Sequence, residues 1–491
     1  MKLSREICRR AHETRDGRFD GRFFIGVTST GVYCRPICPA RTPKPENATY
    51  WPSAAAAAKA GFRPCRRCRP ECAPGAPAAL GAKAAALRAL RLVEAGALDA
   101  APTSALAARV GMTDRHLRRL FQSHFGAAPL KIAQTRRAML AKSLIEGSDL
   151  SMGEIALAAG YRSLTRFNTA IKAAHHRPPT DLRRQTGAAP SRTITLSFAA
   201  RPPFAPSALC AFYAARAIPG VGVVRDGVYH VATHAGGAPA RLSIAFTAGG
   251  VTLEAALSSL NGLAGLIARV RRAVDLDCDP REAARILCAD TVLARAFTAT
   301  GPVRLIGHLD PFETLIRAIL GQQVSLGAAR TLAGRLAARW GERLSQALSV
   351  EGLTHAFPQP DALINAPIED IGVTRARASA IRAVAAAAAG PSDLLDAPVD
   401  PDAWARRLMT LPGVGAWTAQ YAMLRGFCEP DAFPAGDLIL RRAYGALARG
   451  PAPDTRALAR TAAAWRPLRG YAAQALWTYA HQFPDQLRQG A

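Results

Sequence analysis

The sequence predicts a multidomain, mainly α-helical protein. It has 491 residues, which corresponds to three or four domains at roughly 100–200 residues per domain. Two Pro/Gly/Ala-rich segments, 73–79 and 185–192, are typical of linkers. Apolar residues recur at helical spacing between these linkers and again from about Asp290 onward. Alternating or β-branched runs follow the second linker, before Asp290. A hydrophobic fraction of 49% excludes a wholly disordered chain.

Positive charge is the second global feature. The chain has 63 Lys and Arg against 36 Asp and Glu, a net charge of +27, and such an excess indicates a polyanionic partner. Residues 1–187 contain 32 Lys and Arg against 13 Asp and Glu, a net charge of +19. Residues 188–491 contain 31 against 23, a net charge of +8. A basic protein at a membrane surface is the alternative. Because no run of about 18 uncharged apolar residues and no signal-peptide-like start occurs, we expect a soluble, cytoplasmic protein with no membrane partner.

The first predicted domain, 1–75, is a small zinc module of α/β type. Six of the ten cysteines lie in the first 72 residues. Four of them form two close pairs, Cys34-x3-Cys38 and Cys65-x2-Cys68. Two such pairs suit tetrahedral Zn²⁺, because each short loop places two thiolates on one side of the ion. A zinc module without chemistry is the alternative, and Cys8 or Cys72 could replace one ligand.

The residues around these pairs indicate a reactive site. Ser-Thr-Gly-Val-Tyr-Cys-Arg-Pro at 29–36 and Gly-Phe-Arg-Pro-Cys-Arg-Arg-Cys at 61–68 closely resemble the N-terminal domain of the Ada family, methyl-phosphotriester repair proteins and adaptive-response regulators. The resemblance implies that a zinc-bound thiolate, Cys34, accepts a methyl group irreversibly from a DNA phosphotriester. The arginines expected to hold the phosphates are Arg35, Arg63, Arg66, Arg67 and Arg69.

This chemistry is consistent with elementary electrostatics. A zinc-bound thiolate stays deprotonated at neutral pH, so it needs no separate base. Four thiolates on one Zn²⁺ have a net charge of about −2. Because methylation removes one unit of repulsion from the DNA phosphates, repair is expected to tighten DNA binding.

The second predicted domain, 80–187, contains a first helix-turn-helix pattern at 103–125. Thr103 to Val110 predicts a short helix, Gly111-Met112 a turn, and Thr113 the N-cap of a second helix. On that helix one face is apolar, with Leu117, Leu120, Phe121 and Phe125. The other face suits the major groove of DNA and presents Arg115, Arg118, Arg119 and Gln122.

The pattern recurs at 155–171. After Ile155-Ala156-x2-Ala159-Gly160-Tyr161 a helix is expected, with Phe167 and Ile171 inward. Its outward residues are Arg162, Thr165, Arg166 and Thr169. A charged, solvated face of an ordinary helical bundle is the alternative for both units. The stretch from Ile155 to Arg183 resembles the AraC-type DNA-binding domain, which has paired helix-turn-helix motifs, and its place after the zinc module matches the Ada family. The resemblance implies a promoter operator, and RNA polymerase, as partners.

The third and fourth predicted domains are a small α+β unit, 190–298, and an all-α unit, 299–491. Strands are expected at 193–198, 222–235 and 240–246. In the fourth, Leu-Pro-Gly-Val-Gly at 411–415 stands between two helices, so Gly413 and Gly415 allow a tight hairpin whose N–H groups could hold a DNA phosphate. A connection without a ligand is the alternative. Asp437 follows Phe-Pro-Ala-Gly, where a helix N-cap is the alternative to a catalytic carboxylate.

Residues from about 190 to 490 resemble AlkA-type 3-methyladenine DNA glycosylases of the helix-hairpin-helix superfamily. The matching runs include 411–419, Ala-Ile-Leu-Gly-Gln-Gln-Val-Ser at 318–325, Trp-Arg-Pro at 465–467, and Trp477. The resemblance implies that Asp437 is the catalytic carboxylate, with Gly436 where the family has a second one. It places Trp417, Tyr421 and Trp477 around an everted base, and Gln323 at the position of a leucine that wedges into the duplex.

Lysine usage narrows the expected reaction. The chain has seven lysines and the last is Lys172, so strand cleavage through a lysine Schiff base is excluded for the C-terminal half. We therefore interpret the chain as a zinc methyl-acceptor module and an AraC-type regulator fused to a monofunctional glycosylase, acting on alkylated double-stranded DNA. The alternative hypothesis is a transcription regulator whose C-terminal half is catalytically inactive and only binds DNA or a ligand.

Overall fold

The computed structural model describes residues 3–74, 83–183, 193–390, 394–396, 398 and 400–487. The chain forms two compact units, the first comprising Met1–Phe204, His234–Ala268 and Leu276–Cys278, and the second Ala205–Thr233, Arg269–Asp275 and Asp279–Ala491. The predicted linker 185–192, and residues 75–79 of the other linker, lie outside the described residues. Among the helices that the structure describes, none has the length and apolar composition needed to cross a membrane.

The N-terminal segment is a small α/β module, as predicted, built on a four-stranded sheet of order β3-β1-β2-β4. Strands β2 and β4 are parallel, with Tyr33 opposite Pro64. Because parallel neighbours run in the same direction, the residues that follow, Cys34 and Cys65, lie at the same edge of the sheet. The elements are α1 (Arg5–Glu13), β1 (Phe24–Val27), β2 (Val32–Cys34), β3 (Ala48–Trp51), α2 (Ala54–Lys59) and β4 (Arg63–Pro64).

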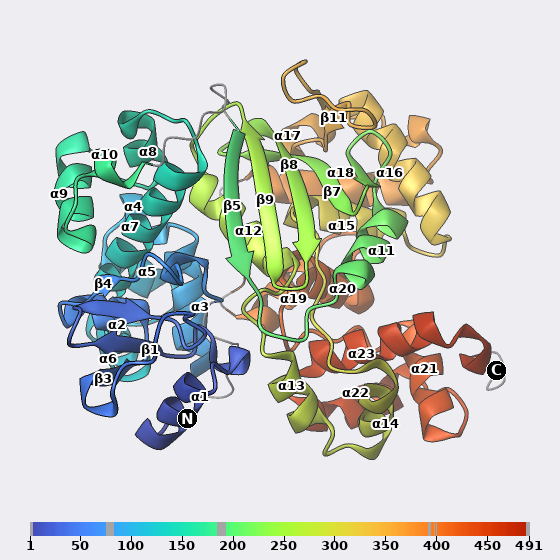
Figure 1. The fold of residues 1–491 in the computed structure, drawn as a ribbon. Helices are drawn as coiled ribbons and strands as arrows, with labels where there is room; N and C mark the ends of the chain where they lie inside the picture. Colours follow the sequence, from blue (N-terminus) through green and yellow to red (C-terminus); the bar gives the residue numbers. More distant parts are fainter. Residues whose placement is uncertain are drawn as a thin grey trace. The chain divides into compact units, whose positions relative to one another are not determined.

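The next segment is all-helical. Its helices are α3 (Lys83–Glu94), α4 (Ala97–Ala100), α5 (Thr103–Arg109), α6 (Asp114–Phe125), α7 (Pro129–Gly147), α8 (Met152–Ala158), α9 (Leu164–His175) and α10 (Pro179–Leu182) (Figure 1). Thr113 caps α6 by accepting from the His116 N–H, and Ser163 caps α9 by accepting from the Arg166 N–H. Both predicted helix-turn-helix units are thus present, each with a short helix, a turn and a capped second helix.

The α+β part holds a five-stranded sheet of order β5-β9-β8-β7-β6, in which β5, β9 and β8 lie side by side (Figure 1). Its elements are β5 (Thr193–Ala199), α11 (Pro206–Arg216), β6 (Gly222–Arg225), β7 (Val228–Ala235), β8 (Ala238–Thr247), β9 (Gly250–Leu257), α12 (Leu263–Ala273) and α13 (Pro280–Leu287). Strand β9 is not among the elements that the sequence predicts. Its Leu-Glu-Ala-Ala sequence has no strand propensity of its own, and pairing on both sides with β5 and β8 makes it a central strand.

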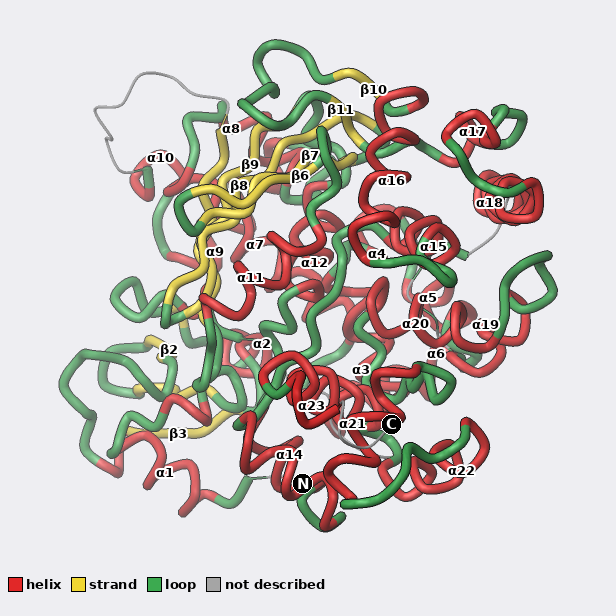
Figure 2. The backbone as a smooth tube through the Cα atoms, turned by 90° about the vertical axis from the view of Figure 1, so that its right-hand side faces the viewer, coloured by secondary structure: helices red, strands yellow, loops and turns green. Residues whose placement is uncertain are grey.

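The C-terminal part is helical apart from the short pair β10 (Glu342–Arg343) and β11 (His355–Ala356) (Figure 2). Helix α15 is its centre, because Leu315, Ile316, Ile319 and Leu320 are fully buried and it packs against α18 and α20. The helices are α14 (Thr291–Thr300), α15 (Pro311–Leu320), α16 (Leu326–Trp340), α17 (Pro360–Leu363), α18 (Arg375–Ala389), α19 (Pro401–Leu408), α20 (Ala416–Phe427), α21 (Leu438–Ala448), α22 (Thr455–Ala462) and α23 (Arg469–Gln482).

Candidate functional site

Four cysteine thiols form a compact group in the N-terminal module. One sulfur atom from each of Cys34, Cys38, Cys65 and Cys68 lies within 4.8 Å of every other, and all four residues are buried. A tetrahedral Zn²⁺ with Zn–S bonds of about 2.3 Å needs sulfur atoms roughly 3.8 Å apart, so the donor set fits this ion. Cys8 and Cys72, the open alternatives, are buried but do not belong to the group.

The thiols also influence one another. Hydrogen bonding to Cys38, and then to Cys65 and Cys68, raises the pKa of Cys34, because a proton shared among crowded thiols is hard to remove. A nearby positive charge such as Zn²⁺ favours the ionised form of Cys34. A backbone donor supports the group, since the Arg35 N–H lies 3.3 Å from Sγ of Cys68.

The side chain of Arg35 is used inside the module. It is 7% exposed; its Nε donates to Asp20 Oδ1 at 2.9 Å, its Nη1 donates to the Cys68 carbonyl at 3.1 Å, and it forms an ion pair with Asp20. These partners hold the Arg35 guanidinium inside the module, which differs from the expected contact with a DNA phosphate. Sequence reasoning missed Asp20, which carries no motif and meets Arg35 only in the fold.

The other arginines near the thiols differ in availability. Arg66 and Arg67 are exposed and Arg63 is half-buried. Arg69 pairs with Glu71 at 3.2 Å and with Glu146 at 3.1 Å. Three of the five arginines that the sequence singled out therefore remain open to a phosphate.

The two recognition-helix candidates present their polar faces outward. On α6, Leu117 and Phe121 are fully buried, and the exposed residues are Arg115, Arg118, Arg119 and Gln122. On α9, Phe167 and Ile171 are fully buried, and Arg166 is exposed, as is Arg162 just before the helix. Nη2 of Arg162 donates to the Ala100 carbonyl at 2.9 Å, so this side chain is already held in place.

In the C-terminal part, Asp437 is the N-cap of α21 and the meeting point of three donors. The Leu440 N–H donates to Oδ1 at 3.0 Å, the Trp477 Nε1 donates to Oδ1 at 3.2 Å, and the Trp417 Nε1 donates to Oδ2 at 3.1 Å. Asp437 is therefore a helix N-cap, the alternative that the sequence left open. Both indoles also donate to this carboxylate, which fixes it between two aromatic side chains. A helix N-cap needs only the backbone donor, so the two indole contacts indicate a further role.

The aromatic residues predicted to line a pocket lie together. Trp417 and Tyr421, one helical turn apart on α20, stack with ring centres 5.0 Å apart at 21°. Tyr421 and Trp477 meet edge to face at 6.3 Å. The guanidinium carbon of Arg425 lies 4.5 Å from the Trp477 ring centre, and Arg425 is 4% exposed. Sequence reasoning missed Arg425, although its spacing of four residues from Tyr421 places it on the same face of α20.

The glycine hairpin joins α19 to α20. Gly413 has φ +71°, and a Cβ there would lie 2.7 Å from the Ala380 Cβ, so this turn requires glycine. The Nε2 of Gln322 donates to the Gly413 carbonyl at 2.9 Å and to the Thr418 hydroxyl at 3.1 Å. Gln322 therefore ties the α15–α16 corner to the hairpin. Its neighbour Gln323 is exposed and has φ 55° at that corner.

Comparisons with known proteins agree with this arrangement. Family models match in chain order as the metal binding domain of Ada at 7–71, a helix-turn-helix domain at 106–185, the AlkA N-terminal domain at 194–310, and the HhH-GPD superfamily base excision DNA repair protein at 316–467. The described fold and these matches define a DNA glycosylase of the helix-hairpin-helix superfamily preceded by a zinc-binding domain and a DNA-binding domain.

A probable bifunctional transcriptional activator/DNA repair enzyme AlkA from Mycobacterium tuberculosis is 40% identical over 98% of each chain. The chain therefore belongs to this family of AlkA-type bifunctional transcriptional activators and DNA repair enzymes. DNA-3-methyladenine glycosylase 2 from Escherichia coli is 31% identical, covering 58% of this chain and 98% of its own. A 3-methyladenine DNA glycosylase structure from Archaeoglobus fulgidus matches with TM-score 0.50 and 21% identity, covering 59% of this chain and 98% of that chain, which shows the fold alone.

Proposed function

We propose that the protein repairs alkylated DNA and regulates the response to alkylation. The C-terminal half hydrolyses the N-glycosidic bond of alkylated bases such as 3-methyladenine. The observation that carries this proposal is the position of Asp437, whose carboxylate accepts from the indoles of both Trp417 and Trp477. The relative from Escherichia coli named a DNA-3-methyladenine glycosylase supports the substrate class.

The aromatic residues and the carboxylate have different tasks. An alkylated purine is cationic and already a good leaving group, so the faces of Trp417, Tyr421 and Trp477 bind it by stacking and cation–π attraction. Asp437 stabilises the positive charge that develops on the sugar and orients the attacking water. The two indole donors keep its oxygen atoms in one orientation.

DNA is held in this half mainly by uncharged groups. The exposed hairpin at Gly413 and Gly415 presents backbone N–H groups to a phosphate. Gln323, exposed at the α15–α16 corner, fills the gap that the everted base leaves. Because the last lysine of the chain is Lys172, the glycosylase is monofunctional and leaves an intact abasic strand.

The N-terminal module accepts methyl groups. Bound Zn²⁺ keeps the thiol of Cys34 deprotonated at neutral pH, with Cys38, Cys65 and Cys68 as the other ligands. Sγ of Cys34 forms a bond to the methyl carbon while that carbon's bond to the triester oxygen breaks, and the phosphodiester leaves with the electron pair. Arg63, Arg66 and Arg67 hold neighbouring phosphates.

Methylation then promotes binding to a promoter operator, because the thiolate group becomes less negative beside the DNA phosphates. The α6 face with Arg115, Arg118, Arg119 and Gln122, together with Arg162 and Arg166, contacts the duplex. RNA polymerase is the further partner that an activator requires. We assign these functions to domains 1–75, 80–187, 190–298 and 299–491.

Base release from methylated DNA tests the catalytic half. The purified protein is expected to release 3-methyladenine, and Asp437→Asn is expected to lose this activity while it keeps its fold, because Asn is an equally good N-cap. If the folded wild-type protein releases no base, the alternative of a regulator with an inactive C-terminal half is correct.

A further inference from the structure

A basic pocket lies where β4 meets the end of α9, both within the first compact unit. Its volume is about 230 Å³. The residues that line it are Arg63, Pro64, Arg66, His175, His176, Arg177 and Leu182. The three lining residues between 63 and 66 belong to the zinc module, and the four between 175 and 182 belong to the second helix-turn-helix unit and the helix that follows it.

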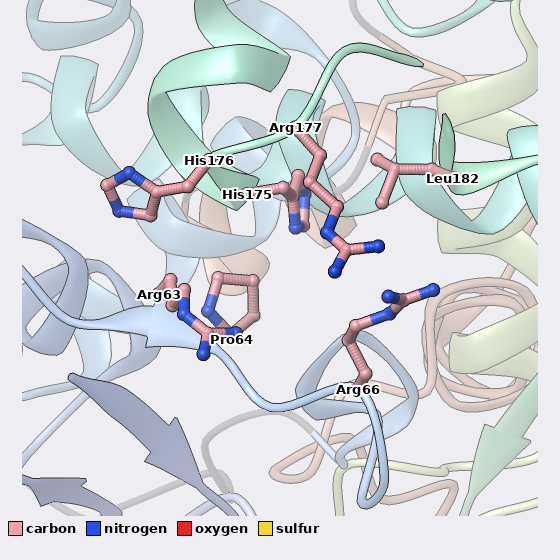
Figure 3. A pocket seen from close by; sticks show the side chains of 7 residues that line it. All are labelled: Arg63, Pro64, Arg66, His175, His176, Arg177 and Leu182. Carbon is pink, nitrogen blue, oxygen red and sulfur yellow. The ribbon is translucent and has the colours of Figure 1, made fainter. Parts of the chain in front are cut away.

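The charged residues that line this pocket are all basic. Figure 3 shows the side chains of Arg66 and Arg177 pointing toward each other from opposite sides. Among the residues that the structure describes, no carboxylate lines the pocket, and none forms an ion pair with Arg63, Arg66 or Arg177. Guanidinium groups that converge without a carboxylate repel each other, and an anion between them removes that repulsion.

A buried histidine also lines this space. His175 is 8% exposed, and its Nε2 has no hydrogen-bond partner among the described residues, while the ring hydrogen-bonds to the Ala138 backbone. A buried polar atom without a protein partner marks a position that ordered water or a bound ion fills. The pocket is therefore polar, and it is wide enough for a phosphate group with its water.

The pocket lies beside the four thiols. Pro64 stands opposite Tyr33 in the parallel pair β2–β4, and each is followed directly by a cysteine of the group. The pocket thus lies on the side of the zinc module that faces α9.

We propose that this pocket binds one backbone phosphate of DNA, held jointly by Arg66 of the zinc module and Arg177 of the second helix-turn-helix unit. The proposal rests on the DNA binding proposed above. It adds that the two domains share a single phosphate, so the strand is clamped between the thiol group and the second helix-turn-helix unit. Contacts to phosphate position the strand and carry no sequence preference.

A double-mutant cycle in the full-length, zinc-loaded protein tests the shared phosphate. Arg66→Gln, Arg177→Gln and the double variant are compared by fluorescence anisotropy with a double-stranded oligonucleotide. Each single change is expected to weaken binding roughly tenfold and to reduce the slope of log K against log salt by roughly 0.9. Because both side chains hold one phosphate, the double variant is expected to be little weaker than either single variant. Arg5→Gln on α1, which removes an exposed arginine far along the sequence from the pocket, is the control for loss of one charge.

The outcomes separate the possible failures. If the wild type binds no DNA, the proposed function as a whole is wrong, and not only the assignment of this pocket. If the wild type binds DNA but Arg177→Gln binds as tightly as Arg5→Gln, or if the effects at Arg66 and Arg177 simply add, the shared phosphate is contradicted. Inorganic phosphate is titrated in parallel. Phosphate could protect the wild type, but not Arg177→Gln, against thermal unfolding, while both proteins bind DNA equally tightly. This result would mean that the pocket takes free phosphate, and it would overturn the DNA assignment.

Discussion

The indole nitrogen of Trp477 lies 3.2 Å from Oδ1 of Asp437, although the two residues are 40 positions apart in the sequence. The same oxygen caps α21 by accepting from the Leu440 N–H. One carboxylate oxygen thus serves the fold and the proposed chemistry at once. The two contributions can be separated by substitution, because they use different donors.

Trp477→Phe removes the indole donor and keeps an aromatic face. We expect kcat for base release to fall roughly tenfold, the cost of about one hydrogen bond to a charged group, with KM nearly unchanged because stacking persists. Steady-state base release measured over a range of DNA concentrations gives both quantities. Trp404→Phe is the control, since its indole donates to the Leu394 carbonyl at 3.1 Å, away from the carboxylate. Wild-type kcat in Trp477→Phe would contradict the assigned orienting role.

Gly413→Ser should destabilise the second unit. Its φ of +71° and a Cβ position 2.7 Å from the Ala380 Cβ make strain of roughly 1–3 kcal/mol unavoidable. Guanidinium unfolding measures this difference. Gly415→Ser is the matched control, because Gly415 is the N-cap of α20 with φ −96° and nothing lies within 4 Å of the position that a Cβ would take there; a change of no more than about 0.5 kcal/mol is expected. Equal effects at the two glycines would refute the explanation.

Lys142→Met should strongly destabilise the first unit. Lys142 and Glu71 form an ion pair with both side chains 1% exposed, and Glu146 lies 3.4 Å from the same ammonium. Removing the cation leaves buried carboxylates short of a partner, which costs about 3–5 kcal/mol. The free energy of unfolding measures the loss. At the exposed Arg9–Glu13 pair, Arg9→Gln should cost less than about 1 kcal/mol. A loss below that value for Lys142→Met would show that the pair is not needed.

Acid should weaken the first unit through His175. Burial, with Lys142 nearby, lowers the pKa of His175 from 6.5 to about 4, while Glu71 opposes and Arg66 reinforces the shift. Because the unfolded chain binds the proton more readily, the free energy of unfolding is at its full value above pH 6.5 and falls as the pH drops toward 4. The loss is about 3 kcal/mol. Unfolding measured from about pH 7.5 down to about pH 4.5 should show a shallower slope for His175→Gln. Parallel slopes for both proteins would exclude His175 as the cause.

Contacts between residues that are close together in the sequence can be predicted from local sequence patterns. The spacing of Trp417 and Tyr421 predicts a shared helix face, and the two close pairs of cysteines predict the thiol group. Long-range pairing is not predictable from composition or periodicity. The partner of Arg35 is Asp20, found only when the module folds, and the tie from Gln322 to the hairpin spans 91 residues. Strand β9 likewise owes its conformation to its neighbours.

The protein is proposed to perform two separate repair reactions in one chain. DNA that carries radiolabelled methyl groups tests this proposal most directly. Two products are counted, label bound to the protein and label released as free base. Cys34→Ser should lose the protein-bound label and keep base release, while Asp437→Asn should lose base release and keep the protein-bound label. If either substitution abolished both products in a folded protein, or if neither product changed, two separate reactions at Cys34 and Asp437 would be contradicted.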